Sequence, residues 1–383
     1  MLNKFKANFD LDTFLVPVLS VLLGFILGAI IMLVSGFNPI QGYQAMLNSA
    51  WGSPFFSGET IARAIPLIFT ALGFAVAMSA GFFNIGLSGQ ALAGWIFSVW
   101  TVFSFQDLPR AILLPLAVII GALAGAIAAG IPGVLRAFFG TSEVITTIML
   151  NYVYLFLATF MLRNFFHADW MRNVDATIPI PQNGSLASPF LSGLTGGARL
   201  NNGLFLAIIA LFAVWFLMKK TTTGYEIRAV GLNATASEYA GISSKRTIVV
   251  SMMISGALAG LGGVVQGIGY FLNYTNQAAS LDIGFNGLAV SLLGNNSPFG
   301  ILFASLLFSM LATGSAGMQA MTIPSEIASI VQASIIFFVG ANFLIRVFLK
   351  KFKKDKAQIA VEVAAVNEKT APKPQDSQGG EKS

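Results

Sequence analysis

Ten apolar runs, separated by polar stretches, make up most of the chain and predict its secondary structure. Because the interior of a lipid bilayer offers no water to backbone amides and carbonyls, runs that cross it are expected to be helices. The pattern therefore predicts an all-α polytopic membrane protein with about ten transmembrane helices. The runs cover about 14–35, 61–80, 85–105, 111–135, 143–162, 203–218, 247–270, 283–294, 299–314 and 327–349.

Two regions are expected to contain short or broken helices. The stretch 80–90 places Asn84, Gln90 and three glycines between apolar segments. The run 283–294 has 12 residues. At 1.5 Å per residue these give ~18 Å of helix, which is less than the ~30 Å thickness of the hydrocarbon core. Short, glycine-interrupted segments in corresponding parts of two halves are typical of a translocation site, so the sequence predicts one here.

Composition supports a membrane-embedded chain. Hydrophobic residues make up 55% of the sequence and charged residues 10%, and the mean hydropathy is +0.76. Since roughly a quarter of the residues in a soluble domain are charged, this chain has too few to cover a water-facing surface. It has no cysteine, which excludes a disulfide framework and a thiolate metal site.

The positive charge predicts the orientation. The net charge of +6 arises from basic residues at the ends of apolar runs, which is typical of membrane topology rather than of nucleic-acid binding. With ten crossings and the N-terminus inside, 17 of the 22 basic residues lie on the cytoplasmic side. We therefore expect both termini in the cytoplasm and the chain in the plasma membrane.

This orientation divides the chain into a transmembrane domain and a tail. Residues 1–349 form the transmembrane domain, with an external loop at 163–202 and a cytoplasmic loop at 219–246. The tail, 350–383, begins with the basic run KKFKKDK, which favours anionic lipid headgroups. Its remainder is polar and is expected to be disordered.

Polar residues in the fifth run are candidates for a functional role. Glu143, Thr147 and Asn151 are spaced by four residues, which places them on one face of a helix. The stripe as a whole is interpreted as the lining of a pathway. For Glu143 alone a structural role is preferred, in which it caps the helix start. Asn151 would then bond to a neighbouring helix, and both interpretations stay open.

Small residues at four-residue spacing predict close helix packing within the bundle. The sequence GALAG occurs at 121–125 and again at 256–260, and such small-residue faces let helices approach in lipid. The GLGG sequence that follows lacks the Gly-Lys-Ser/Thr of a nucleotide-binding loop. The single histidine, His167, cannot form a metal site alone. We expect no catalytic residue, no metal and no cofactor.

The loop 219–246 is the longest polar interruption on the predicted cytoplasmic side. Thr235 and Glu238 fit a capping box, in which both side chains bond free amides at a helix start. Gly241 is expected to end that short helix in a left-handed conformation. Because a helix of two turns is marginal alone, a partner surface would explain it; an ordinary basic loop is the alternative.

Four stretches resemble one family of membrane proteins. The sequence 224–242 is similar to the cytoplasmic coupling segment of ABC importer permeases, in the branch that holds the ribose, branched-chain amino acid and nucleoside permeases. The stretches 83–90 (FNIGLSGQ), 141–152 (TSEVITTIMLNY) and 284–300 (GFNGLAVSLLGNNSPFG) resemble the same permeases, most of all the nucleoside type served by basic-membrane-protein lipoproteins. That type commonly has an acidic residue where this chain has Ser88.

The resemblance implies roles for particular residues. The coupling segment would dock on a cytoplasmic ATPase subunit and transmit its movement, and the interrupted helices and polar stripe would form the translocation path. The implied ATPase-coupling residues are Tyr225, Glu226, Arg228, Asn233, Glu238 and Tyr239. The candidate translocation-path residues are Phe83, Asn84, Gln90, Glu143, Thr147, Asn151 and Asn286.

The resemblance also implies partners. They are an ABC ATPase subunit, a second and non-identical permease subunit, an external substrate-binding lipoprotein, membrane lipid and a nucleoside substrate, with no nucleic acid. The chain would be a transport subunit rather than an enzyme. The alternatives are a sugar or branched-chain amino acid ABC permease, and a secondary transporter driven by an ion gradient. The latter needs an intramembrane carboxylate or cation site, for which Glu143 is the main candidate.

Overall fold

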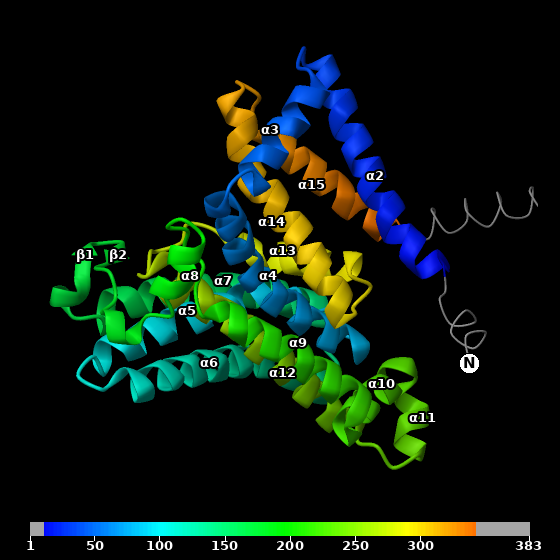
Figure 1. The fold of residues 1–383 in the computed structure, drawn as a ribbon. Coiled ribbons are helices and arrows are strands. Elements are labelled where there is room, and N and C mark those ends of the chain that lie inside the picture. Colours follow the sequence, from blue (N-terminus) through cyan, green and yellow to red (C-terminus); the bar gives the residue numbers. More distant parts are fainter. Residues whose placement is uncertain (1–10, 342–383) are drawn as a thin grey trace, which may run out of the picture.

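The computed structural model describes residues 11–341 as a bundle of helices with one small β-hairpin (Figure 1). Each of the ten predicted runs lies in a helix, although the last is described only to residue 341. The predicted tail, 350–383, lies outside the described residues. The helices that contain the runs are α2 (Leu11–Val34), α4 (Pro54–Ser79), α5 (Leu87–Ser104), α6 (Arg110–Phe139), α7 (Glu143–Phe165), α9 (Gly203–Lys220), α12 (Ser244–Val264), α13 (Asp282–Leu293), α14 (Pro298–Ala320) and α15 (Ser325–Gly340).

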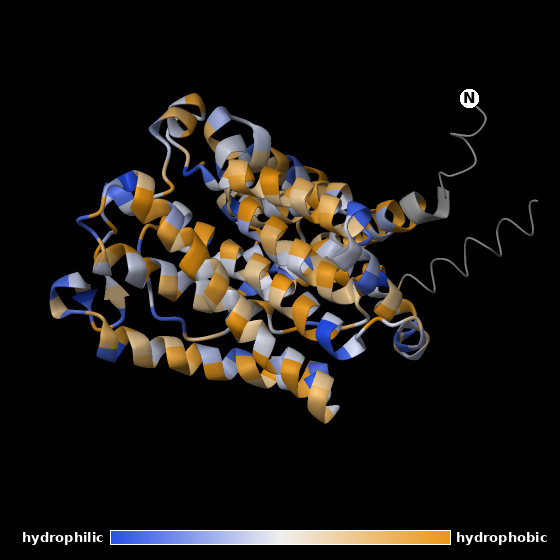
Figure 2. Ribbon diagram, turned by 90° about the horizontal axis from the view of Figure 1, so that it is seen from below, coloured by the Kyte–Doolittle hydropathy of each residue, from blue (hydrophilic) through white to orange (hydrophobic). Residues whose placement is uncertain are grey.

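Seven helices within residues 11–341 are long and apolar enough to cross a membrane, as expected for a polytopic membrane protein. One of these spans joins α12 to a π-helical segment, η3 (Val265–Phe271). The apolar helices α13 and α15 are shorter, with 12 and 16 residues. Figure 2 shows hydrophobic residues along the helices and hydrophilic residues toward their ends. Ten crossings and two cytoplasmic termini remain predictions.

One helix, α3 (Pro39–Trp51), was not predicted, because polar residues interrupt its apolar pattern. Its N-cap, Asn38, accepts a hydrogen bond from the backbone N–H of Ile40 at 3.0 Å, which satisfies one free amide of the first turn. Packing on α14 stabilises it, since Gly317 leaves room for the backbone of α3. Helix α4 also begins earlier than predicted, because Ser53 caps it and Pro54 occupies its first position.

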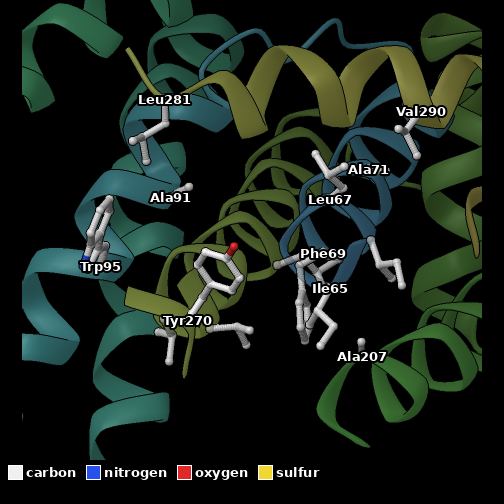
Figure 3. Packing of buried hydrophobic residues seen from close by; sticks show 14 of the residues in the cluster. Ile65, Leu67, Phe69, Ala71, Ala91, Trp95, Ala207, Tyr270, Leu281 and Val290 are labelled. Carbon is white, nitrogen blue, oxygen red and sulfur yellow. The ribbon is translucent and has the colours of Figure 1, made fainter. Parts of the chain in front are cut away.

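The centre of the bundle is α12, which packs against α4, α5 and α6. The predicted close packing of small residues is present, and the structure shows that the two GALAG motifs pack on each other: a Cβ added to Gly125 would lie 2.7 Å from the Cα of Gly260. Only glycine permits that approach, so the small-residue spacing brings α6 and α12 together. Figure 3 shows the surrounding core, in which Tyr270 lies between Trp95 on one side and Phe69 on the other.

The two ends of the bundle differ in character (Figure 1). At one end, termed the hairpin end, lie β1 (Met171–Asn173), β2 (Ala176–Thr177) and α8 (Pro189–Leu194), so the predicted external loop 163–202 contains short regular elements. At the other, termed the coupling end, lie α10 (Thr222–Leu232) and α11 (Ala234–Tyr239).

A buried carboxylate ties three segments together near the hairpin end. Glu59 of α4 accepts hydrogen bonds from the Tyr270 hydroxyl at 3.0 Å and from the Arg199 backbone N–H at 2.8 Å. Because a buried carboxylate is costly without partners, these two bonds fix the start of α4 against η3 and the segment before α9.

Candidate functional site

The two predicted interruptions are present, and their helices begin beside each other. Residues 82–85 are non-helical between α4 and α5, and α13 has 12 residues. The Ser88 hydroxyl of α5 donates a hydrogen bond to the Leu281 carbonyl oxygen, just before α13, at 2.8 Å. A Cβ on Gly284 would collide with Ser88, so glycine is needed for this approach. The start of α5 and the start of the short helix α13 therefore meet inside the bundle.

Buried amide side chains hold the non-helical segment before α5. The Asn84 Nδ2 donates to Gln90 Oε1 at 3.0 Å and to Ser255 Oγ of α12 at 2.9 Å. Its Oδ1 accepts from the Gly86 backbone N–H at 2.9 Å. Asn84 and Gln90 are both buried. Because each amide is satisfied by a neighbour, the segment can remain non-helical without orphaned polar groups.

Two residues of the α7 stripe complete this arrangement. The Asn151 Oδ1 accepts from the Gly89 N–H at 2.8 Å, and its Nδ2 donates to the Ile85 carbonyl oxygen at 3.0 Å. The Thr147 Oγ1 accepts from the Ile85 N–H at 3.3 Å. Side chains of α7 thus replace the helical hydrogen bonds that the interruption removes. We term Asn84, Gln90, Thr147, Asn151 and Ser255 the amide cluster; sequence reasoning missed Ser255, since a serine in an apolar helix gives no distinctive signal.

The other three candidate path residues lie outside the amide cluster. Glu143 is the first residue of α7 and pairs with Arg136 of α6, with 3.3 Å between Oε2 and Nε. Asn286 of α13 accepts a hydrogen bond from Gln332 Nε2 of α15 at 2.7 Å. Phe83 is half-buried and precedes the cluster in the chain. The polar stripe of α7 is therefore divided: Glu143 is at the helix start, whereas Thr147 and Asn151 face α5.

The coupling end carries the short helix that the loop sequence predicts, with a different N-cap. Asn233, not Thr235, caps α11, because its Oδ1 accepts from the Ala236 N–H at 3.0 Å. The Thr235–Glu238 capping box was wrong, since the helix begins at Ala234 and Thr235 is already inside it. Gly241 ends the helix as predicted, with φ +84°. Asn233 was itself a predicted coupling residue, and here it joins α10 to α11.

Several large side chains of α10 and α11 are exposed. Tyr239 is 91% exposed, Leu232 89% and Tyr225 62%. Glu238 is exposed, whereas Glu226 and Arg228 are half-buried. Large apolar side chains exposed together are typical of an interaction surface.

Behind this surface, α10 contacts the end of α4. A Cβ on Gly231 would lie 3.0 Å from the Ser79 carbonyl carbon, and a Cβ on Gly81 would lie 3.5 Å from the Gly231 Cα. The backbones of α10 and of the segment that follows α4 are therefore in direct contact. That segment leads into residues 82–86 and the amide cluster, so a displacement of α10 has a short structural route to the interrupted helix α5.

Within residues 11–341, no group of three or more His, Cys, Asp or Glu side chains could hold a metal ion. The polar groups at the centre are amides and hydroxyls that bond to one another.

Comparison with known proteins gives one family. Residues 58–340 match the family described as the branched-chain amino acid transport system permease component. No solved structure matches the chain significantly.

Similar curated proteins cover nearly the whole chain. The chain is 56% identical over 348 residues to the nucleoside ABC transporter permease protein NupB of Lactococcus lactis subsp. cremoris, which covers 90% of this chain and 96% of that protein. It is 42% identical over 348 residues to the guanosine ABC transporter permease protein NupP of Bacillus subtilis, and the match covers 91% of this chain and 99% of that protein. A second Lactococcus permease protein, NupC, is 26% identical to this chain over 248 residues, and the match covers 65% of this chain and 78% of that protein.

Proposed function

Since the chain belongs to the family of branched-chain amino acid transport system permease components, we propose that it is a membrane-spanning permease subunit of an ATP-driven nucleoside importer. The observation that carries this proposal is the 56% identity to a nucleoside permease over 90% of the chain. The subunit transports rather than catalyses, and the energy comes from a separate ATPase in the cytoplasm.

We propose that α10 and α11 dock on that ATPase. Their exposed residues Tyr225 and Tyr239 form the contact, and Glu226, Arg228 and Glu238 surround it with charge. Asn233 sets the angle between the two helices by capping α11. The contact between Gly231 and the end of α4 supports a route for movement from this surface to the interrupted helix.

We propose that the starts of α5 and α13 form the centre of the translocation path. The amide cluster fixes the wall of the path, while Phe83, Glu143 and Asn286 border it. The convergence of the starts of α5 and α13 at the Ser88–Leu281 hydrogen bond supports this placement. Discontinuous helices of this kind form binding sites in many transporters, because their free ends present polar backbone groups at depth.

The proposed assembly has further components. The pair NupB and NupC in one organism supports a second, non-identical permease subunit beside this chain. An external lipoprotein delivers the substrate to the hairpin end, and the complex resides in the plasma membrane with both chain termini in the cytoplasm. The alternation of access between the two sides then follows ATP binding and hydrolysis.

Uptake of radiolabelled uridine by cells that express the complete complex tests the function. Unlabelled adenosine and guanosine are expected to compete, whereas glucose, ribose and leucine are not. Uptake should require ATP and should persist after an ionophore collapses ion gradients. Competition by leucine or a sugar in place of nucleosides would select the alternative substrate classes. Uptake abolished by the ionophore at a normal ATP level would select a secondary transporter.

A further inference from the structure

A carboxylate, Asp282, stands at the first position of α13 and is held on both sides. The carbonyl oxygen of Leu281, before it, accepts the Ser88 hydroxyl at 2.8 Å. The carbonyl oxygen of Ile283, after it, accepts the Thr70 hydroxyl of α4 at 2.9 Å. The backbone around Asp282 is therefore fixed to α5 and α4 by two independent hydrogen bonds.

The bond to Thr70 places Asp282 beside the interior of α4, a helix long and apolar enough to cross a membrane. Thr70 is 16 residues beyond Pro54 and nine before Ser79, the two ends of α4, which at 1.5 Å per residue is ~24 Å and ~14 Å from those ends. Thr70 also lies beside α12, since its Cγ2 would be 3.3 Å from a Cβ on Gly262. The sequence-based run began one residue later, at 283, so Asp282 was assigned to the preceding loop.

The side chain of Asp282 is exposed at this depth. Among residues 11–341 its carboxylate has neither an ion pair nor a hydrogen-bond partner. A charged side chain at mid-membrane does not face lipid, because the loss of hydration is too costly; it faces a water-filled cavity or a polar partner. The exposed face of α13 therefore meets water or a polar partner rather than lipid.

Two more side chains share this face of α13 with Asp282, since residues three and four positions apart are neighbours on a helix. Phe285 is 51% exposed and presents an aromatic surface. Asn286 uses its Oδ1 to accept from Gln332, and within the described residues its Nδ2 donates to no protein group. One helix face thus offers a hydrogen-bond acceptor with a negative charge, an aromatic ring and an amide donor.

We infer that this face of α13 recognises the nucleoside in the path, with the Asp282 carboxylate accepting hydrogen bonds from the ribose 2′ and 3′ hydroxyls. The two oxygens of a carboxylate match two adjacent hydroxyl donors, as in other charge-assisted pairs. The Phe285 ring is the surface on which the base packs. This inference rests on the proposed function and specifies which parts of the substrate the permease subunit itself binds.

The test compares Asp282→Asn with wild type in the complete importer, using uridine and 2′,3′-dideoxyuridine. The binding lipoprotein is the same in both complexes, so its own preference cancels when variant and wild type are compared. Asp282→Asn is expected to lower uridine uptake about tenfold or more, the lower end of what a hydrogen bond to a charged group contributes. Uptake of the dideoxy analogue should change by less than about twofold.

Two further variants make the result specific. Glu326→Gln removes an exposed first-turn acid from α15 and is expected to leave both uptake rates unchanged. Asp282→Glu keeps the charge and should retain preference for uridine over the analogue, which a purely structural role of Asp282 would not require. Because the readout is a ratio of two substrates, lower expression of a variant does not affect it.

Two results would overturn the inference while leaving the nucleoside importer intact. The first is that Asp282→Asn discriminates between uridine and the dideoxy analogue as well as wild type does. The second is an equal loss of uridine and the dideoxy analogue. If the wild-type complex takes up no nucleoside at all, the proposed function itself fails.

Discussion

Replacement of Asn151 by leucine isolates the contribution of the amide cluster. Leucine has a similar volume but no polar atom, so the Gly89 N–H and the Ile85 carbonyl lose the partners at 2.8 and 3.0 Å that Asn151 provides. Gly89 is buried and Ile85 is half-buried. Each unsatisfied buried group costs about 1–3 kcal/mol, so Asn151→Leu is expected to destabilise the protein by about 2–6 kcal/mol.

The assay is thermal unfolding of the detergent-purified subunit, followed by intrinsic fluorescence, together with uptake by the complex. At about 2 °C per kcal/mol for a chain of this size, the midpoint should fall by roughly 4–12 °C. Uptake should be lost as well, because the segment before α5 is then free to move. The matched control is Asn164→Leu on the same helix: Asn164 is exposed and bonds only to the Phe160 carbonyl within α7.

The two variants, Asn151→Leu and Asn164→Leu, should differ clearly in stability. Asn164→Leu should unfold within about 1 °C of wild type, because an exposed polar group regains its hydrogen bond from water. If Asn151→Leu unfolds at the wild-type temperature, or if both variants lose stability equally, the amide cluster does not hold the interrupted helix.

Three other predictions concern packing, coupling and the hairpin end. Gly125→Ala should destabilise the subunit by about 1–3 kcal/mol in the same unfolding assay, whereas Gly130→Ala, whose Cβ would meet only a methionine side chain at 3.4 Å, should be neutral. Tyr239→Ala should weaken titrated ATPase binding by about 2 kcal/mol, or about 30-fold, and Phe190→Ala, 71% exposed at the hairpin end, should not; equal effects would exclude α11 as the docking surface. Glu59→Leu should lower stability by about 2 kcal/mol or more, since a buried hydroxyl and an amide lose their acceptor; an unchanged unfolding midpoint would contradict that role.

The sequence alone determined which apolar runs are helices and where two of them are short or interrupted. Apolar runs predict helices because lipid forces every backbone group into an internal hydrogen bond, and α4, α6 and α12 follow that rule. The four-residue spacing of small residues around Gly125 and Gly260 predicted close packing, because a helix face of glycine and alanine lets any neighbouring helix approach closely. By contrast, α3 was missed, since its amphipathic pattern is stabilised by α14 rather than by its own composition.

Only the tertiary structure decided which polar residues meet. Asn84 and Asn151 are 67 positions apart, and both bond around the segment before α5; their shared role depends on how α7 packs on α5. In the same way, Asp282 reads as a loop residue in sequence, and only its neighbours' bonds to Ser88 and Thr70 place it beside the interior of α4. Hydrogen bonding of the backbone within a helix is local, so the sequence reveals where it occurs. The partner of a buried side chain, by contrast, is set by segments distant in the chain.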